Sequence, residues 1–73
     1  MLKRFSNSMR LGTVKFYNQE EGIGSIIPSN GGREVSVFAH GVVDPIKTSN
    51  IVQFDLEFTS HGIEATKVIV LSA

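Results

Sequence analysis

The sequence contains no cysteine and no tryptophan, and it carries no excess charge of either sign. Without cysteine, neither a disulfide bond nor a thiolate metal site can form, which fits a reducing compartment. No apolar run approaches the roughly 20 residues that a membrane-spanning helix needs. Residues 1–8 also lack the apolar stretch of a secretory signal. From these absences we expect a cytoplasmic protein without a membrane segment.

The balance of charge, seven basic against seven acidic residues, bears directly on function. Proteins that bind nucleic acid commonly present an excess of basic side chains to phosphate, and this chain has none. The charges are nevertheless unevenly placed, because the first four charged residues are all basic: Lys3, Arg4, Arg10 and Lys15. This basic stretch either meets an anionic partner or is simply solvated.

At 73 residues, the chain has room for a single small domain. We expect a flexible N-terminal extension over residues 1–8 and one folded domain over residues 9–73. Met1 and Met9 are both candidates for the natural start of translation. No ten-residue stretch has the periodicity of a helix, so an all-β domain is predicted.

Five segments show the two-residue alternation of half-buried strands. The clearest covers residues 50–58, where Val52, Phe54, Leu56 and Phe58 alternate with polar residues. Turn-forming residues separate the segments. The predicted strands cover residues 11–18, 22–28, 34–40, 50–58 and 64–71. The predicted core consists of Val14, Ile26, Val35, Val37, Val52, Phe54, Leu56 and Val68.

Two of these strands place apolar or aromatic residues on their outward faces. In residues 34–40, Val35, Val37 and Ala39 form the inward face, which leaves Phe38 and His40 outside. In residues 22–28, the outward face carries Ile23, Ser25 and Ile27.

The first strand has imperfect alternation. Val14, Phe16 and Tyr17 cannot all point inward in a regular strand, so we expect a β-bulge near Phe16, with Phe16 exposed and Tyr17 partly buried.

Five short strands at near-regular spacing favour a closed barrel, since a two-sheet sandwich needs more strands than this length supplies. The predicted fold is therefore a small five-stranded antiparallel Greek-key barrel. One face of such a barrel is a known platform for oligonucleotides.

Several motifs resemble those of the bacterial cold-shock proteins. Residues 12–18, GTVKFYN, resemble the family opening G-x-V-K-W-F-N, and residues 22–28, GIGSIIP, resemble its motif G-F-G-F-I-x-P. Residues 35–39, 46–54 and 61–68 resemble the later motifs, so the likeness extends over residues 9–71. It implies an OB-fold barrel of the cold-shock type that stacks single-stranded RNA or DNA on exposed aromatic residues and acts as an RNA chaperone or as a regulator of transcription or translation.

The departures from the family pattern all fall on the binding side. Ile23, Ser25, Ser36 and Ala39 stand where the family has phenylalanine, and Glu21 replaces a lysine. Each base stacked on an aromatic ring contributes roughly 1–3 kcal/mol, so we expect weak, salt-dependent binding. The resemblance places the nucleic-acid site at Lys15, Phe16, Asn18, Ile23, Ser25, Phe38, His40 and His61.

Another function remains open at this stage, in which the barrel binds a protein or a second copy of itself. Ile23, Ile27 and Ala39 form a flatter apolar patch suited to such an interface, and an exposed sheet edge or strand exchange could produce a homodimer.

We expect no enzyme, because no nucleophile stands beside a base in a recognisable motif. We also expect no cofactor and no metal, because His40 and His61 lack a second ligand at coordinating spacing.

Overall fold

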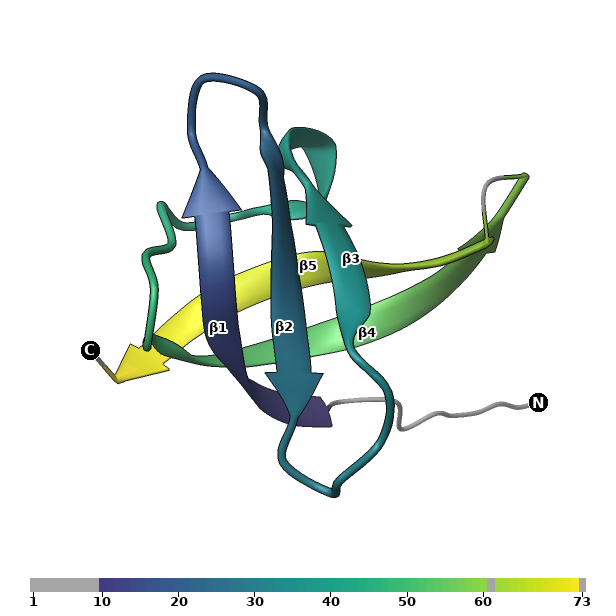
Figure 1. The fold of residues 1–73 in the computed structure, drawn as a ribbon, viewed down its shortest axis with the longest axis horizontal. Coiled ribbons are helices and arrows are strands. Elements are labelled where there is room, and N and C mark those ends of the chain that lie inside the picture. Colours follow the sequence, from purple (N-terminus) through teal and green to yellow (C-terminus); the bar gives the residue numbers. More distant parts are fainter. Residues whose placement is uncertain (1–9, 61, 73) are drawn as a thin grey trace, which may run out of the picture.

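The structure is a computed structural model that describes residues 10–60 and 62–72 (Figure 1). The predicted extension over residues 1–8 and His61 lie outside the described residues. Within the described ranges, no helix is long and apolar enough to cross a membrane. The elements are β1 (Arg10–Asn18), β2 (Ile23–Pro28), β3 (Val35–Phe38), the 3-10 helix η1 (Ala39–Gly41), β4 (Ile51–Thr59) and β5 (Gly62–Ser72).

The five strands close into a barrel in the order β1-β2-β3-β5-β4, which confirms the predicted all-β fold. Four of the five junctions are antiparallel, as expected. The junction between β3 and β5 is instead parallel, with Ser36 beside Glu64 and Val37 beside Ala65. This single parallel junction has a simple reason. An odd number of strands cannot alternate in direction all the way around a closed ring, so one junction must be parallel.

The predicted β-bulge is present in β1. Val14 pairs with Ile26, but the next pair along joins Phe16 to Ser25, so Lys15 is the extra residue of the bulge. Val14 is therefore buried inside the barrel, whereas Lys15 and Phe16 both face outward. Tyr17 is half-buried and packs against the core, as expected.

Seven of the eight predicted core residues are buried, and Leu56 is half-buried against them. The core also contains Ile46 and Ala65, which the alternation did not predict. Ile46 comes from the connection between η1 and β4, where no strand pattern exists to reveal its orientation. The buried set is Val14, Ile26, Val35, Val37, Ile46, Val52, Phe54, Ala65 and Val68.

Two residues assigned to inward strand faces are exposed. Ala39 begins η1, so the strand alternation ends at Phe38 and no longer sets its direction. Phe58 is 81% exposed although it shares a strand face with the buried Phe54. Within the described residues, β1 pairs with β4 as far as Phe54, and the β4–β5 hairpin continues past the barrel (Figure 1). No opposing strand within the described residues covers Phe58.

Candidate nucleic-acid interface

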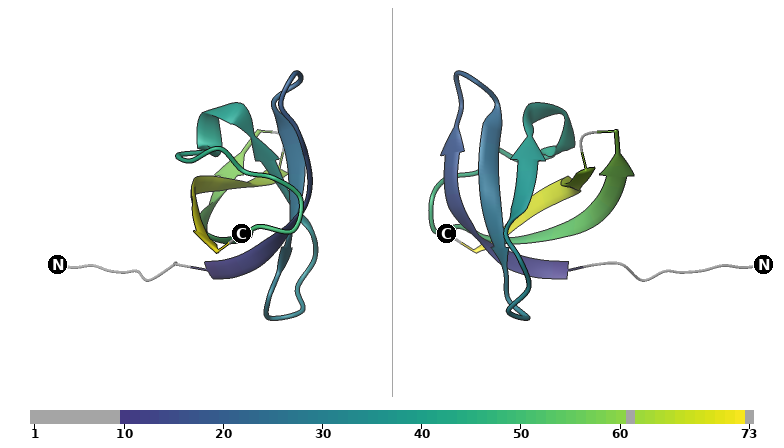
Figure 2. Two further views of the ribbon diagram at one scale, coloured as in Figure 1. Left: turned by 90° about the vertical axis from the view of Figure 1, so that its left-hand side faces the viewer. Right: turned by 45° about the vertical axis from the view of Figure 1, so that its right-hand side comes forward.

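The outer face of β1, β2 and β3 brings the predicted binding residues together in two cross-strand rows. Figure 2 shows these strands side by side, with β4 and β5 crossing behind them. Register places Ser25 between Phe16 and Ser36, and it places Ile23 between Asn18 and Phe38. The prediction that Phe16, Ile23, Ser25 and Phe38 share one face, with Ser36 beside them, is confirmed.

Two phenylalanines stand at opposite corners of this face. Phe16 is 45% exposed and Phe38 is half-buried, with the exposed Ile23 lying beside Phe38 on the middle strand. The two rings are two strands apart sideways and two residues apart along the strands. Strand spacing and rise put their backbones about 12 Å apart. Each ring can therefore hold a different base, with apolar surface in between.

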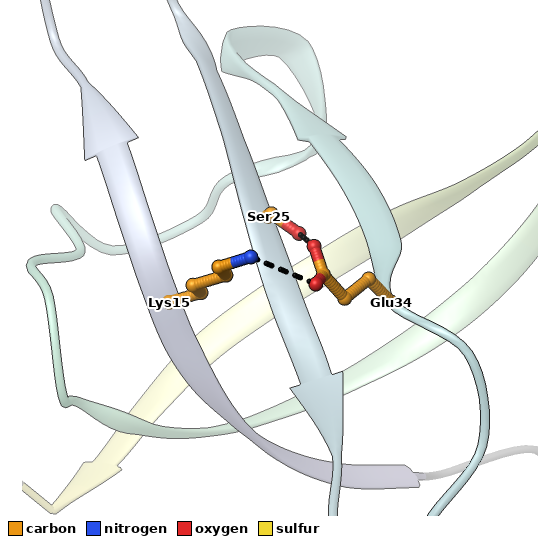
Figure 3. Close-up of polar contacts among 3 residues, drawn as sticks. All are labelled: Lys15, Ser25 and Glu34. Carbon is orange, nitrogen blue, oxygen red and sulfur yellow. Dashed lines mark hydrogen bonds and ion pairs between the residues drawn. The ribbon is translucent and has the colours of Figure 1, made fainter.

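A polar cluster occupies the rest of the face (Figure 3). The side chain of Glu34 reaches across β2, where its Oε2 accepts a hydrogen bond from Lys15 Nζ at 2.9 Å. Its Oε1 accepts from Ser25 Oγ at 2.8 Å. These bonds, the one from Lys15 first and the one from Ser25 second, lower the pKa of Glu34. The centre of the face therefore carries an ionised carboxylate.

This cluster changes the expected roles of two predicted site residues. Ser25 is only 8% exposed, so its side chain offers a ligand almost no contact surface, although its position on the outer face is as expected. Lys15 is exposed, but its ammonium group is engaged by Glu34 rather than free for phosphate. The sequence analysis assigned no role to Glu34, because a strand pattern does not reveal how far its side chain reaches.

Asn18 shapes the turn that ends β1. Its side-chain oxygen accepts a hydrogen bond from the backbone of Glu21 at 3.0 Å, and its carbonyl accepts from the N–H of Gly22 at 2.7 Å. Gly22 has a φ of 68°, a backbone conformation that glycine adopts without steric cost. Asn18 thus supports the edge of the face, and the exposed Glu21 lies in the same turn.

The far edge of the face, beyond Phe38, is formed by η1 packing against β5. The rings of Phe38 and His40 are stacked, with centroids 5.9 Å apart and planes within 13°. His40 Nε2 is 2.5 Å from Oε1 of Glu64, whose side chain is only 5% exposed. Sequence reasoning missed Glu64. Its one signal was a carboxylate between two apolar residues, Ile63 and Ala65.

The basic side chains of the described residues do not gather on this face. Arg10 lies near the far end of β1, where it lines a groove together with Arg33 and Leu56. Lys3, Arg4 and His61 lie outside the described residues. Among the residues that the structure describes, no group of three or more histidine, cysteine, aspartate or glutamate side chains is placed to hold a metal ion.

A closed five-stranded barrel with exposed aromatic residues on the face of its first three strands is the architecture of an oligonucleotide-binding fold. The chain is 36% identical over 64 residues to the cold shock-like protein CspG of Shewanella violacea, covering 82% of this chain and 91% of that protein. Cold shock-like protein CspA of the same organism is 34% identical over the same shares. The chain belongs to the cold-shock domain family, a non-enzymatic family of nucleic-acid-binding proteins.

A relative from an animal shares the same segment. The protein lin-28 homolog of Drosophila melanogaster is 36% identical over 64 residues, which cover 82% of this chain. The chain spans only 33% of the length of that protein. No family model matches the chain.

Proposed function

We propose that the protein binds single-stranded RNA or DNA on the outer face of β1, β2 and β3, with low affinity. The observation that carries this proposal is the shared outward orientation of Phe16, Ile23 and Phe38 on three adjacent strands. Aromatic rings spaced along a sheet face stack bases without regard to their sequence. Membership of a family that binds nucleic acid supports the same function.

The low affinity follows from what else lies on the face. Serines occupy the two positions in register with Phe16, and Glu34 neutralises Lys15 there. Each missing platform removes roughly 1–3 kcal/mol of stacking. An ionised carboxylate at the centre of the face also repels the phosphate backbone. The affinity that remains should depend strongly on salt, because it rests partly on phosphate contacts.

A salt-dependent titration tests this proposal. Fluorescence anisotropy with a labelled oligothymidine or oligouridine should detect weak binding at low salt that disappears as salt rises. Replacing both platform rings, Phe16→Ser with Phe38→Ser, should abolish binding, whereas Glu21→Lys should tighten it at low salt. Suppose that the parent does not bind at low salt and that neither Glu21→Lys nor an added ring restores binding. The nucleic-acid function would then be excluded.

In the cell, we expect the protein to act in the cytoplasm as an RNA chaperone or as a regulator of transcription or translation. Weak and sequence-tolerant capture of open strands suits an RNA chaperone, since the strand must be released again. Melting of a short labelled RNA hairpin, followed with and without the protein, tests this role.

A second candidate function is self-association, and the β4–β5 hairpin favours it. Phe58 and Ile63 are register partners near the end of the hairpin, and both are exposed. Next to them lies a groove of about 280 Å³ that Leu56 and Ile63 line, with Arg10 and Arg33 at its rim. We expect Phe58 of a second copy to enter this groove, with its neighbour Glu57 facing Arg10 and Arg33.

The oligomeric state in solution tests the second candidate. Sedimentation should show concentration-dependent dimers in the parent protein, and Phe58→Ser should convert them to monomers. Ile27→Ser is the matched control, because it removes an exposed apolar residue from the opposite side of the barrel. If Ile27→Ser dissociates the dimer and Phe58→Ser does not, the interface lies on the outer face of β1–β3 instead.

A further inference from the structure

His40 is held in one orientation by a buried carboxylate. The 3-10 helix η1 folds so closely onto β5 that a Cβ on Gly41 would lie 3.3 Å from the Cα of Thr66. This packing covers Glu64, whose side chain keeps only 5% of its exposure, while His40 above it stays 69% exposed. A buried carboxylate needs a hydrogen-bond partner, and His40 Nε2 lies 2.5 Å from Oε1 of Glu64.

The contact determines which ring nitrogen of His40 carries the proton and which one stays accessible to a ligand. An ionised Glu64 accepts a hydrogen bond only, so Nε2 must carry the proton that it donates. In the neutral imidazole, Nδ1 is then a bare acceptor, which a phosphate oxygen cannot use. When the ring is protonated, Nδ1 also becomes a donor and the ring gains a positive charge. The exposed edge of His40 therefore attracts phosphate only in the protonated state.

The ring also extends the aromatic surface of the proposed site. It stacks against Phe38 with the planes within 13°, so His40 adds a second aromatic ring to the stack at the β3 edge of the face. Phe38 is in register with Ile23, which links this surface to the rest of the platform.

We propose that Phe38 and His40 form a nucleotide subsite in which the base extends their ring stack and the adjoining phosphate contacts protonated His40. Glu64 is its positioning residue. This inference rests on the proposed binding of single-stranded nucleic acid and adds a specific subsite whose affinity rises as the pH falls. The ligand class is a nucleotide within a single strand, bound through a π face and a phosphate oxygen.

The other charged groups near the subsite are acidic. Glu64 from β5 is in contact, and Glu57 on β4 is its register partner. On the opposite side, Ala39 donates a hydrogen bond to the carbonyl of Gly22, which directly follows Glu21. β3 contributes no charged side chain. Protonated His40 is thus the cation that this edge of the described barrel can offer to phosphate.

The test compares binding at two pH values in a background where His40 is the sole histidine. The chain has two histidines, so His61→Gln serves as the parent. With oligothymidine at low salt, this parent should bind about five-fold more tightly at pH 5.5 than at pH 8, the gain expected from one additional hydrogen bond after solvent exchange. His40→Phe should keep the affinity seen at pH 8 but lose the pH dependence. His40→Ala should weaken binding at both values, by about five-fold or more, since a stacking surface is lost.

Variants of Glu64 separate positioning from folding. Glu64→Gln keeps an oxygen that accepts from Nε2, so it should preserve the pH dependence, whereas Glu64→Leu should weaken binding at pH 5.5. Phe58→Ala is the matched control that removes an exposed ring away from the subsite. Long-range proton–nitrogen NMR spectra should show the Nε2-protonated tautomer of His40 in the free protein and its loss in Glu64→Leu. Thermal melts confirm that each variant is folded.

The outcomes distinguish this inference from the proposed function. If the parent binds but His40→Ala matches it at both pH values, or if His40→Phe retains the pH dependence, the subsite is refuted while nucleic-acid binding stands. If the parent does not bind oligothymidine at either pH, both fail. A His40 tautomer protonated at Nδ1 in the free protein would also overturn the role given to Glu64.

Discussion

The outer face of β1–β3 and the inner face of the β4–β5 hairpin both expose aromatic residues, but for different reasons. Phe16 and Phe38 point away from the barrel by strand parity, and the bulge at Lys15 produces that parity in β1. Phe58 points toward the same side of its strand as the buried Phe54, yet it is 81% exposed. On the first surface the direction of the side chain creates exposure. On the second, no strand among the described residues covers the side chain.

The difference shows that exposure alone does not identify a binding site. The outer face combines its rings with an ordered polar cluster and with a histidine held by Glu64. The hairpin surface combines Phe58 and Ile63 with a groove rimmed by arginines. The first surface suits flat bases with phosphates, and the second suits an apolar side chain. Four predictions test this division.

The largest effect should come from comparing two phenylalanines of the same strand. Phe54→Ala should lower the free energy of unfolding by about 3–5 kcal/mol, since it leaves a cavity in a fully buried site. Phe58→Ala should change it by no more than about 0.5 kcal/mol, because the ring is already in water. Urea denaturation followed by circular dichroism measures both. A comparable loss in Phe58→Ala would mean that another part of the chain covers the hairpin.

Adding a ring to the outer face should strengthen nucleic-acid binding. Ser36 is exposed and lies in the same row as Phe16, so Ser36→Phe should tighten oligothymidine binding by about 1–3 kcal/mol with little added salt dependence. Ser36 is a better position than Ser25, whose hydroxyl donates to Glu34. The matched control is Ser60→Phe, which adds a ring at the hairpin turn and should leave the affinity unchanged. Equal tightening by both variants would indicate nonspecific apolar binding.

Removing the carboxylate from the outer face should release Lys15 for phosphate. Glu34→Gln should tighten binding at low salt and steepen the slope of log affinity against log salt by about 0.7, the value for one added phosphate contact on a single strand. Glu20→Gln removes the same charge from the β1–β2 turn and should leave the slope unchanged. An unchanged slope in Glu34→Gln would show that Lys15 does not reach the nucleic acid.

The smallest effect concerns the titration of Glu34. Hydrogen bonds from Lys15 and then Ser25 lower its pKa, so Lys15→Met should raise that pKa toward the ordinary carboxyl range, and Ser25→Ala should raise it less. A lowered pKa stabilises the folded protein above the ordinary carboxyl pKa, and this contribution is lost as the pH falls through the lowered value. The pair is exposed, so the change in stability should be small. Carboxyl-carbon NMR titration measures the pKa, and an unshifted Glu34 in the parent would contradict the contact.

Much of the fold could be predicted because two-residue alternation reports directly which side of a strand is buried. It placed Val14, Val37 and Val52 correctly, and the crowding of Phe16 beside Tyr17 revealed the bulge. It failed for Ile46, which is buried from a connection without a strand pattern. It also failed for Phe58, because alternation predicts the side of the strand to which a side chain points. It does not predict whether another element packs against that side.

The candidate site was predictable only at the level of its face. Parity and resemblance together placed Phe16, Ile23 and Phe38 on one surface, and the register of β1, β2 and β3 agrees. The contacts of Glu34 and Glu64 were not predictable. Along the chain, Glu34 lies 19 residues from Lys15 and nine from Ser25, and Glu64 lies 24 residues from His40. A local pattern carries no information about such pairs.

By itself, the sequence determined that five strands form, where the turns separate them and which aromatic side chains point out of the barrel. These properties depend on neighbouring residues along the chain, through strand parity and turn chemistry. Only the tertiary structure decided that Ser25 is buried, that Phe58 is exposed and that His40 contacts a buried carboxylate. Those outcomes depend on where each strand ends and on which side chains reach across neighbouring strands. Whether a side chain is buried is decided by segments that are distant in the sequence and that closure of the barrel brings together.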